Sequence, residues 1–124
     1  MSVIKHESIQ IAILGCPNAG KSTLINVIAK SRLRVGNWPG VTVEKREALL
    51  HEGDHRLYFI DLPGTYGLCS LAAEELVTRQ YLESEHPDVI INVVDATQLE
   101  RQLALTFQLL EYRIPMMLVL TMAD

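Results

Sequence analysis

The chain has 124 residues, of which 48% are hydrophobic and 21% charged, and 11 basic against 15 acidic side chains give a formal net charge of −4. This balance is typical of one globular domain and excludes a disordered or collagen-like chain. The acidic charge argues against a non-specific nucleic-acid binder, and the lack of a polybasic cluster argues against electrostatic attachment to a membrane surface.

No apolar run is long enough to span a bilayer, because the longest, at residues 114–123, has about ten residues where roughly 20 are needed. The opening residues, Met-Ser-Val-Ile-Lys-His-Glu-Ser, lack the apolar core of an export signal. Cys16 and Cys69 are too few for a disulfide framework and show no metal-ligand spacing, which is typical of a reducing compartment.

Short apolar runs alternate with segments of helical periodicity along the chain. In chain order the pattern predicts a strand at 9–14, a helix at 21–30, a loop at 31–42, strands at 43–50 and 56–60, a helix at 73–84, a strand at 89–94, a helix with the apolar stripe Leu99, Leu103, Phe107 and Leu110, and a strand at 114–120. We therefore predict an α/β fold over residues 1–124, with a mostly parallel sheet, one antiparallel hairpin strand and helices on both faces. Ligands of such sheets bind at the carboxyl ends of the strands.

Residues 15–22, Gly-Cys-Pro-Asn-Ala-Gly-Lys-Ser, fit the phosphate-loop pattern G-x-x-x-x-G-K-[ST] between a predicted strand and a predicted helix. The glycines let backbone N–H groups point inward at a phosphate, and the helix that begins near Gly20 adds its positive end. Lys21 supplies a cation for the β- and γ-phosphates, and the Ser22 hydroxyl can bind Mg²⁺. A turn that only closes a strand–helix unit would not need Lys followed by Ser. The predicted nucleotide contacts are Gly15, Cys16, Pro17, Asn18, Ala19, Gly20, Lys21, Ser22 and Thr23.

The segment Asp61-Leu62-Pro63-Gly64 follows the predicted strand at 56–60. An aspartate at this strand end can reach Mg²⁺ through water, and Gly64 can offer its N–H group to the γ-phosphate, so that the loop senses this phosphate. The pattern D-x-x-G is a weak signal by itself, and a simple turn at Pro63-Gly64 is the alternative. The phosphate loop upstream favours the nucleotide interpretation.

Two further positions complete the predicted site. Thr42 lies in the predicted loop at 31–42, where its hydroxyl could complete the Mg²⁺ shell; the alternative is a β-branched residue that starts a strand. Asp124 follows Thr121 by three residues after the last predicted strand. A carboxylate there would accept hydrogen bonds from guanine N1–H and the exocyclic amine, which adenine cannot match. Without the phosphate loop, this segment would be read as a polar chain end.

Together these elements resemble a translation-factor-class small GTPase, and most closely the N-terminal G domain of the FeoB family, the bacterial ferrous iron transport protein B. The resemblance covers nearly the whole chain from about residue 9, and it rests on residues 15–26, 34–44, 61–68, 91–96 and 99–101. The stretch Val-Gly-Asn-Trp-Pro-Gly-Val-Thr-Val-Glu at 35–44 is far more specific than the phosphate loop.

The resemblance implies a P-loop NTPase of the Ras-like G-domain type that binds GTP and GDP and hydrolyses GTP. It implies Fe²⁺ uptake through a membrane transport region of the same full-length protein, which this chain does not contain. The chain itself would be soluble at the cytoplasmic face of the bacterial inner membrane, with no nucleic-acid partner.

The resemblance also implies two cations. Mg²⁺ would be held by Ser22 and Thr42, with Asp61 acting through water. K⁺ would be held by Asn18 and backbone carbonyls near Gly36 and Trp38, where it could neutralise charge on the bridging phosphate oxygens as an arginine finger does. Lys21, Asn18 and Thr42 are then the catalytic candidates. The rest of the loop at the nucleotide would be Trp38, Pro39, Gly40 and Val41, with Trp38 alternatively serving only to pack its loop.

The chain departs from the usual GTPase pattern at two positions. Thr65 stands where many small GTPases carry a water-orienting glutamine, so we expect slow hydrolysis. Thr121 replaces the asparagine of Asn-x-x-Asp; it keeps a hydroxyl but loses the amide that tethers the phosphate loop and the base. We expect weaker nucleotide binding without loss of selectivity for guanine.

The resemblance further implies a C-terminally incomplete domain, because the later base-contacting loop, the last strand and the closing helix would follow Asp124. The apolar strand at 116–120 would then be an exposed edge, which natural sheets avoid, and the chain would tend to aggregate. Two alternatives remain for the function: a nucleotide-binding module without significant turnover, and a ribosome- or tRNA-associated GTPase. The stretch Asn37-Trp38-Pro39-Gly40 and the acidic charge argue against the latter.

Overall fold

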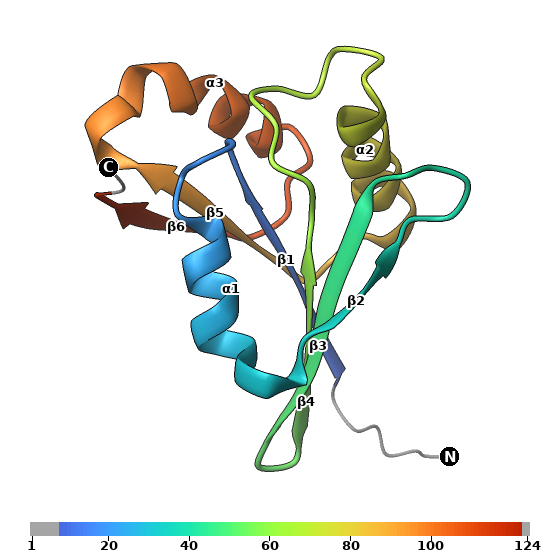
Figure 1. Cartoon of the computed structure of the whole chain (residues 1–124). Coiled ribbons are helices and arrows are strands. Elements are labelled where there is room, and N and C mark those ends of the chain that lie inside the picture. Colours follow the sequence, from blue (N-terminus) through green and yellow to red (C-terminus); the bar gives the residue numbers. More distant parts are fainter. Residues whose placement is uncertain (1–7, 123–124) are drawn as a thin grey trace.

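The structure is a computed structural model that describes residues 8–122, and it contains a six-stranded sheet in the order β2-β3-β4-β1-β5-β6 (Figure 1). The elements in chain order are β1 (Ser8–Gly15), α1 (Lys21–Ala29), the 3-10 turn η1 (Lys30–Arg32), β2 (Arg34–Asn37), β3 (Glu44–Glu52), β4 (His55–Asp61), α2 (Ala73–Glu85), β5 (Val89–Asp95), the 3-10 turn η2 (Ala96–Gln98), α3 (Leu99–Leu110) and β6 (Met116–Thr121). Every predicted strand and helix is present, with ends that differ by a few residues.

The sheet is parallel through its centre. β1 pairs with β4 and β5, and β5 pairs with β6, all in parallel, whereas β3 is antiparallel to both β4 and β2. The register brings the ends of four strands to one edge of the sheet: Gly15, Asp61, Asp95 and Thr121. This is the edge at which the sequence motifs predict a ligand.

Strand β2 lies within the segment that the sequence predicts to be a loop. Its residues pair antiparallel with β3, with Arg34 opposite Glu47 and Asn37 opposite Glu44. All four residues of β2 are exposed, so the strand carries no alternation of apolar and polar side chains. Backbone pairing with β3 defines this strand, and the side-chain pattern does not.

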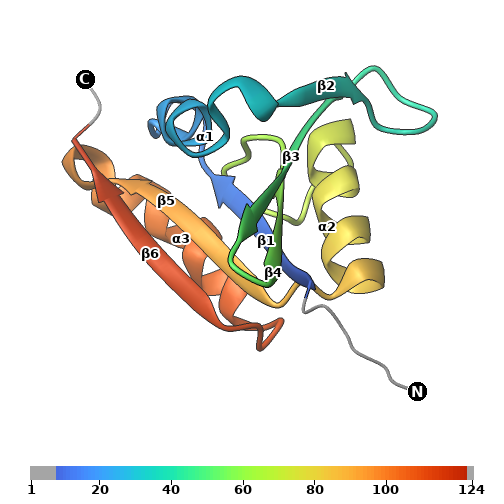
Figure 2. The ribbon, with the colours of Figure 1, turned by 90° about the horizontal axis from the view of Figure 1, so that it is seen from below.

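Apolar side chains fill both faces of the sheet. On one face, Ala12, Leu14 and Ile60 pack against α2 and α3, with Leu82 and Leu105 from the helices. On the other face, Ile13, Phe59 and Val93 pack against α1 through Ile25. Successive residues of β1 thus point to opposite faces, as a strand covered on both sides requires. Figure 2 shows the helices around the sheet from below.

The predicted helix α3 is present, but the apolar stripe of Leu99, Leu103, Phe107 and Leu110 is not its buried face. Three of its members are largely exposed: Leu99 (42%), Phe107 (64%) and Leu110 (54%). The buried face instead carries Gln102, Leu105, Thr106 and Leu109.

Hydrogen bonds to β5 explain which face of α3 is buried. Asn92 lies inside the molecule and donates from its side chain to Thr106 Oγ1 at 2.7 Å. The Asp95 backbone N–H donates to Gln102 Oε1 at 2.7 Å. Buried polar groups need such partners, and turning the apolar stripe inward would leave these without them.

Strand β6 lies at one edge of the described sheet. Side chains on both of its faces are exposed to solvent: Met117 is 56% exposed, Leu118 45% and Leu120 61%. This confirms the expectation of an exposed apolar edge strand. His51 and His55, at the β3–β4 hairpin, are exposed as well. Residues 8–122 contain neither a cluster of metal-binding side chains nor a helix whose length and hydropathy suit a bilayer crossing.

Candidate nucleotide site

The phosphate loop connects β1 to α1 by a tight backbone turn. Asn18 and Gly20 both have positive φ angles, 66° and 93°. A Cβ atom at Gly15 would lie 2.8 Å from the Val93 carbonyl oxygen, so a larger residue would not fit there. The amino end of α1 has no side-chain cap and no acidic residue in its first turn. Its backbone N–H groups are therefore available to an anion.

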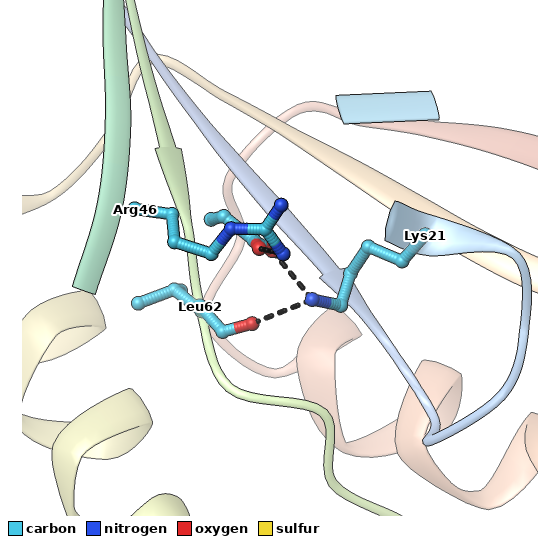
Figure 3. Close-up of polar contacts among 4 residues, drawn as sticks. Lys21, Arg46 and Leu62 are labelled. Carbon is cyan, nitrogen blue, oxygen red and sulfur yellow. Dashed lines mark hydrogen bonds and ion pairs between the residues drawn. The ribbon is translucent and has the colours of Figure 1, made fainter. Parts of the chain in front are cut away.

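Lys21, the first residue of α1, points across this edge of the sheet toward the end of β4 (Figure 3). Its Nζ atom lies 2.5 Å from Asp61 Oδ1 and 3.0 Å from the Leu62 carbonyl oxygen. Arg46 on β3 reaches the other carboxylate oxygen, with Nη1 3.5 Å from Asp61 Oδ2. The lysine of the phosphate loop and the aspartate of D-x-x-G thus form one ion pair.

This ion pair is almost closed to solvent, since the side chains of Lys21 and Asp61 are 11% and 5% exposed. Burial raises the pKa of the Asp61 carboxyl above its usual range, while the positive charges of Lys21 and Arg46 oppose that rise. Sequence reasoning missed Arg46, because only the hairpin register, which places it opposite Asp61, brings it here.

The D-x-x-G segment lies directly on the phosphate loop. The Thr65 N–H group donates to the Gly15 carbonyl oxygen at 3.2 Å. A Cβ atom at Gly64 would lie 3.3 Å from backbone atoms of Pro17. Thr65 is 4% exposed, and its hydroxyl has no hydrogen-bond partner among the described residues. Two motifs that are 39 residues apart in the sequence, counted from Ser22 to Asp61, are therefore adjacent.

Thr121, at the end of β6, reaches the phosphate loop through its hydroxyl. The Oγ1 atom donates to the Ala19 carbonyl oxygen at 2.6 Å and lies 3.4 Å from the Val94 carbonyl oxygen. The hydroxyl that Thr121 keeps thus contacts the phosphate loop where the amide of an asparagine is usual, and the expected weakening of nucleotide binding stays a prediction. Asp124, the predicted guanine-binding residue, lies outside the described residues.

The segment 38–43, the Thr42 loop, is placed away from the phosphate loop. It lies beside α2 in both views, whereas Lys21 begins α1 (Figures 1 and 2). Trp38 packs edge to face on Tyr81 of α2, with ring centroids 5.9 Å apart. The exposed residues of the loop are Pro39, Gly40, Val41 and Thr42. The structure thus does not bring Thr42 to Ser22, and it shows the loop-packing role for Trp38.

The remaining predicted residues are positioned by these elements. Asn18, Ser22 and Thr23 are exposed at the head of α1, and Gly36 pairs with Lys45 between β2 and β3. Cys16 is 2% exposed, and burial raises the pKa of its thiol, although Arg101 opposes this. A buried thiol of this kind is not a nucleophile, in keeping with a mainly backbone role for Cys16.

Comparison with known proteins agrees with this site. A family model described as ferrous iron transport protein B matches residues 9–124. The Fe(2+) transporter FeoB of Helicobacter pylori J99 is 50% identical over 118 residues, which are 95% of this chain and 18% of that protein. The Fe(2+) transporter FeoB of Escherichia coli K12 is 46% identical over 122 residues, 95% of this chain and 16% of that protein. The chain therefore spans under a fifth of the length of these curated relatives.

Solved structures show the same fold. The G domain of the T. maritima FeoB iron transporter superposes with a TM-score of 0.87 at 37% identity, covering 92% of this chain and 72% of that chain. A GDP-bound variant of S. thermophilus NFeoB gives 0.84 at 49% identity, covering 90% of this chain and 44% of that chain. The described residues have the architecture of a Ras-like G domain, with its phosphate loop and D-x-x-G segment in contact. The chain belongs to the FeoB family of ferrous iron transport proteins.

Proposed function

We propose that this chain binds GTP and GDP with Mg²⁺ and hydrolyses GTP slowly as the G domain of a ferrous iron transporter. One observation carries the proposal: Lys21, Asp61 and Thr121 converge on one phosphate loop at the carboxyl edge of the sheet. The GDP bound to the S. thermophilus relative supports a guanine nucleotide as the ligand. Family membership argues against the ribosome- or tRNA-associated alternative.

The described residues fit a phosphate chain and Mg²⁺. The uncapped amino end of α1 offers N–H groups to the phosphates, and the exposed Ser22 hydroxyl lies at the same end. On phosphate binding, Lys21 exchanges part of its contact with Asp61 for the β- and γ-phosphates. Mg²⁺ at Ser22, with Asp61 acting through water, would supply neutralising charge to the phosphates.

Thr42 and the K⁺ site need a movement of the Thr42 loop. Asn18 is an exposed residue of the phosphate loop and can offer its side-chain oxygen to a monovalent cation. Its proposed partners are the carbonyl groups near Gly36, which pairs with Lys45 of β3, and near Trp38, which packs on Tyr81 of α2. Closure of this loop together with the end of β2 would bring both the carbonyl groups and Thr42 to the nucleotide, so that the γ-phosphate orders the loop.

Slow turnover follows from Thr65. Its side chain is 4% exposed, and it has no amide group with which to orient an attacking water. The partner of the switch would be the membrane transport region of the full-length protein, which would place this domain at the cytoplasmic face of the membrane.

A second candidate is a nucleotide-binding module without turnover. The observation that favours it is the buried Lys21–Asp61 pair together with a Thr42 loop that packs on α2. If both contacts persist with GTP bound, the catalytic groups do not assemble.

Two measurements separate these candidates. Calorimetric titration with GTP, GDP and ATP in Mg²⁺ should show binding of the guanine nucleotides and none of ATP. Lys21→Ala should abolish the binding of guanine nucleotides. Lys30 is an exposed lysine past the other end of α1, and Lys30→Ala should leave this binding unchanged. Phosphate release from GTP above the buffer rate in KCl, and less in NaCl, supports the GTPase. Binding without release in either salt supports the module, and no binding by folded protein refutes both.

A further inference from the structure

Tyr81 lies in the middle of α2, outside every nucleotide motif, and holds the side chain of Trp38. The two rings meet edge to face, with an interplanar angle of 72° and 5.9 Å between centroids. Lys45 Nζ lies 4.8 Å from the centroid of the same indole ring. Trp38 thereby packs against the buried cluster on the α2–α3 face, to which Tyr81 belongs. Tyr81 and Lys45 together form a seat for this one side chain.

The seat controls the position of Thr42, because the loop is short and internally bonded. The Trp38 N–H group donates to the Val43 carbonyl oxygen at 2.9 Å, and the Val41 N–H group donates to the Trp38 carbonyl oxygen at 3.3 Å. Thr42 lies inside this small turn, and its side chain is exposed. While Trp38 occupies its seat, the loop that carries Thr42 therefore stays beside α2 and away from the amino end of α1 (Figures 1 and 2).

The seat leaves two buried polar groups without hydrogen bonds in the described part of the chain. Trp38 Nε1 and the Tyr81 hydroxyl are buried, and neither has a hydrogen-bond partner among residues 8–122. Tyr81 is 7% exposed, and burial raises its pKa to about 12, so the group without a partner is a neutral hydroxyl. A buried polar group without a partner destabilises the arrangement that buries it. Edge-to-face packing favours the seated loop, and these two polar groups oppose it.

We propose that Tyr81 is a positioning residue that sets how readily the Thr42 loop leaves α2 to reach a nucleoside triphosphate. The inference rests on the proposed function, in which Thr42 acts only when the γ-phosphate is present. A ligand shifts a two-state equilibrium only by its differential affinity for the two states. GTP with Mg²⁺ favours the released loop, whereas GDP makes no contact that needs Thr42. A change at Tyr81 should therefore alter the ratio of the affinity for GTP to the affinity for GDP.

Two substitutions at Tyr81 should move this ratio in opposite directions. Tyr81→Phe keeps the ring and removes the hydroxyl without a partner, which stabilises the seat; affinity for a non-hydrolysable GTP analogue should fall about threefold relative to GDP. Tyr81→Leu removes the edge-to-face contact, and the relative affinity should rise about two- to tenfold. Tyr112→Phe, a tyrosine beyond α3, is the matched control and should leave the ratio unchanged.

Trp38 is the single tryptophan of the 124 residues, so its fluorescence reports the seat without any nucleotide. Tyr81→Leu should increase acrylamide quenching of Trp38, while Tyr81→Phe should not. Unchanged quenching in a folded Tyr81→Leu protein, or a ratio that moves the same way or not at all in both variants, overturns the inference. Failure of the unsubstituted protein to bind any nucleotide would instead refute the proposed function, and the quenching result would still show whether Tyr81 seats Trp38.

Discussion

The hydroxyl of Thr121 is the contact whose removal tests the site most directly. Thr121→Val keeps the shape of the side chain and removes the donor to the Ala19 carbonyl oxygen, 2.6 Å away. Ala19 is fully buried, so no other donor can easily replace the hydroxyl. The substitution thus removes one hydrogen bond between β6 and the phosphate loop and leaves the packing around Gly20 largely in place.

The loss of this bond should lower the free energy of unfolding by about 1–2 kcal/mol, the usual effect of leaving a buried backbone acceptor without its partner. That is about a five- to thirtyfold change in the ratio of folded to unfolded protein. The same hydrogen bond holds the phosphate loop in place for the nucleotide. If the loop loses its order without this bond, nucleotide binding must restore that order, and the free energy of binding becomes less favourable by up to the same amount. GDP affinity should then fall by up to roughly tenfold for each 1.4 kcal/mol.

Urea unfolding and calorimetric titration with GDP and Mg²⁺ measure the two effects. Thr121→Ser retains the hydroxyl and should stay close to the unsubstituted protein in both, apart from a small loss of packing. Thr121→Asn restores the amide usual in GTPases and should bind GDP at least as tightly. If Thr121→Val unfolds at the same urea concentration and binds GDP as tightly as the unsubstituted protein, the tether has no energetic role.

Two further predictions concern the interior of the molecule. Asn92→Ala removes the donor to Thr106 inside the core and leaves a cavity, so the free energy of unfolding should fall by about 2–3 kcal/mol in urea titrations; a loss below half of that would contradict the hydrogen-bonded orientation of α3. Cys69 is exposed and Cys16 is buried with a raised pKa, so a thiol reagent at neutral pH should modify Cys69 first and Cys16 only on unfolding, as peptide mass mapping can show. Equal modification of both in folded protein would contradict the burial of Cys16.

The sequence predicts the order of elements because the central strands are continuous apolar runs, a pattern that belongs to strands covered on both faces. β2 escapes prediction since none of its side chains is buried and only the backbone of β3 defines it. The orientation of α3 escapes prediction for a different reason. The helix carries apolar residues on more than one face. The hydrogen bonds that Asn92 and Asp95 of β5 donate to side chains of α3 decide which of these faces is buried.

The candidate site likewise contains residues that the sequence predicts and residues that it does not. Lys21 and Asp61 are predictable because the chemistry of phosphate and Mg²⁺ requires these residue types at fixed spacing within a motif. The contact of Thr121 with Ala19 joins residues 102 positions apart, and its donor is the residue that departs from the usual motif. Arg46 has no motif, and its contact with Asp61 depends on hairpin register. Short-range patterns therefore predict the ligand groups, while the groups that support them depend on tertiary structure.

Arg46 matters for what happens to Asp61 when Lys21 turns to a phosphate. A carboxylate that is 5% exposed cannot remain charged at low free energy without a compensating cation, and burial already raises its pKa. If Lys21 were the only partner, its departure would favour protonation, and a neutral carboxyl is a poor acceptor for Mg²⁺-bound water. Arg46 Nη1, 3.5 Å from Oδ2, comes from β3 and has no reason to leave with Lys21. On the proposed function, Arg46 therefore adds to the charge of Mg²⁺ in favouring the ionised form of Asp61 during the exchange, and β3 connects it directly to the loop that carries Thr42.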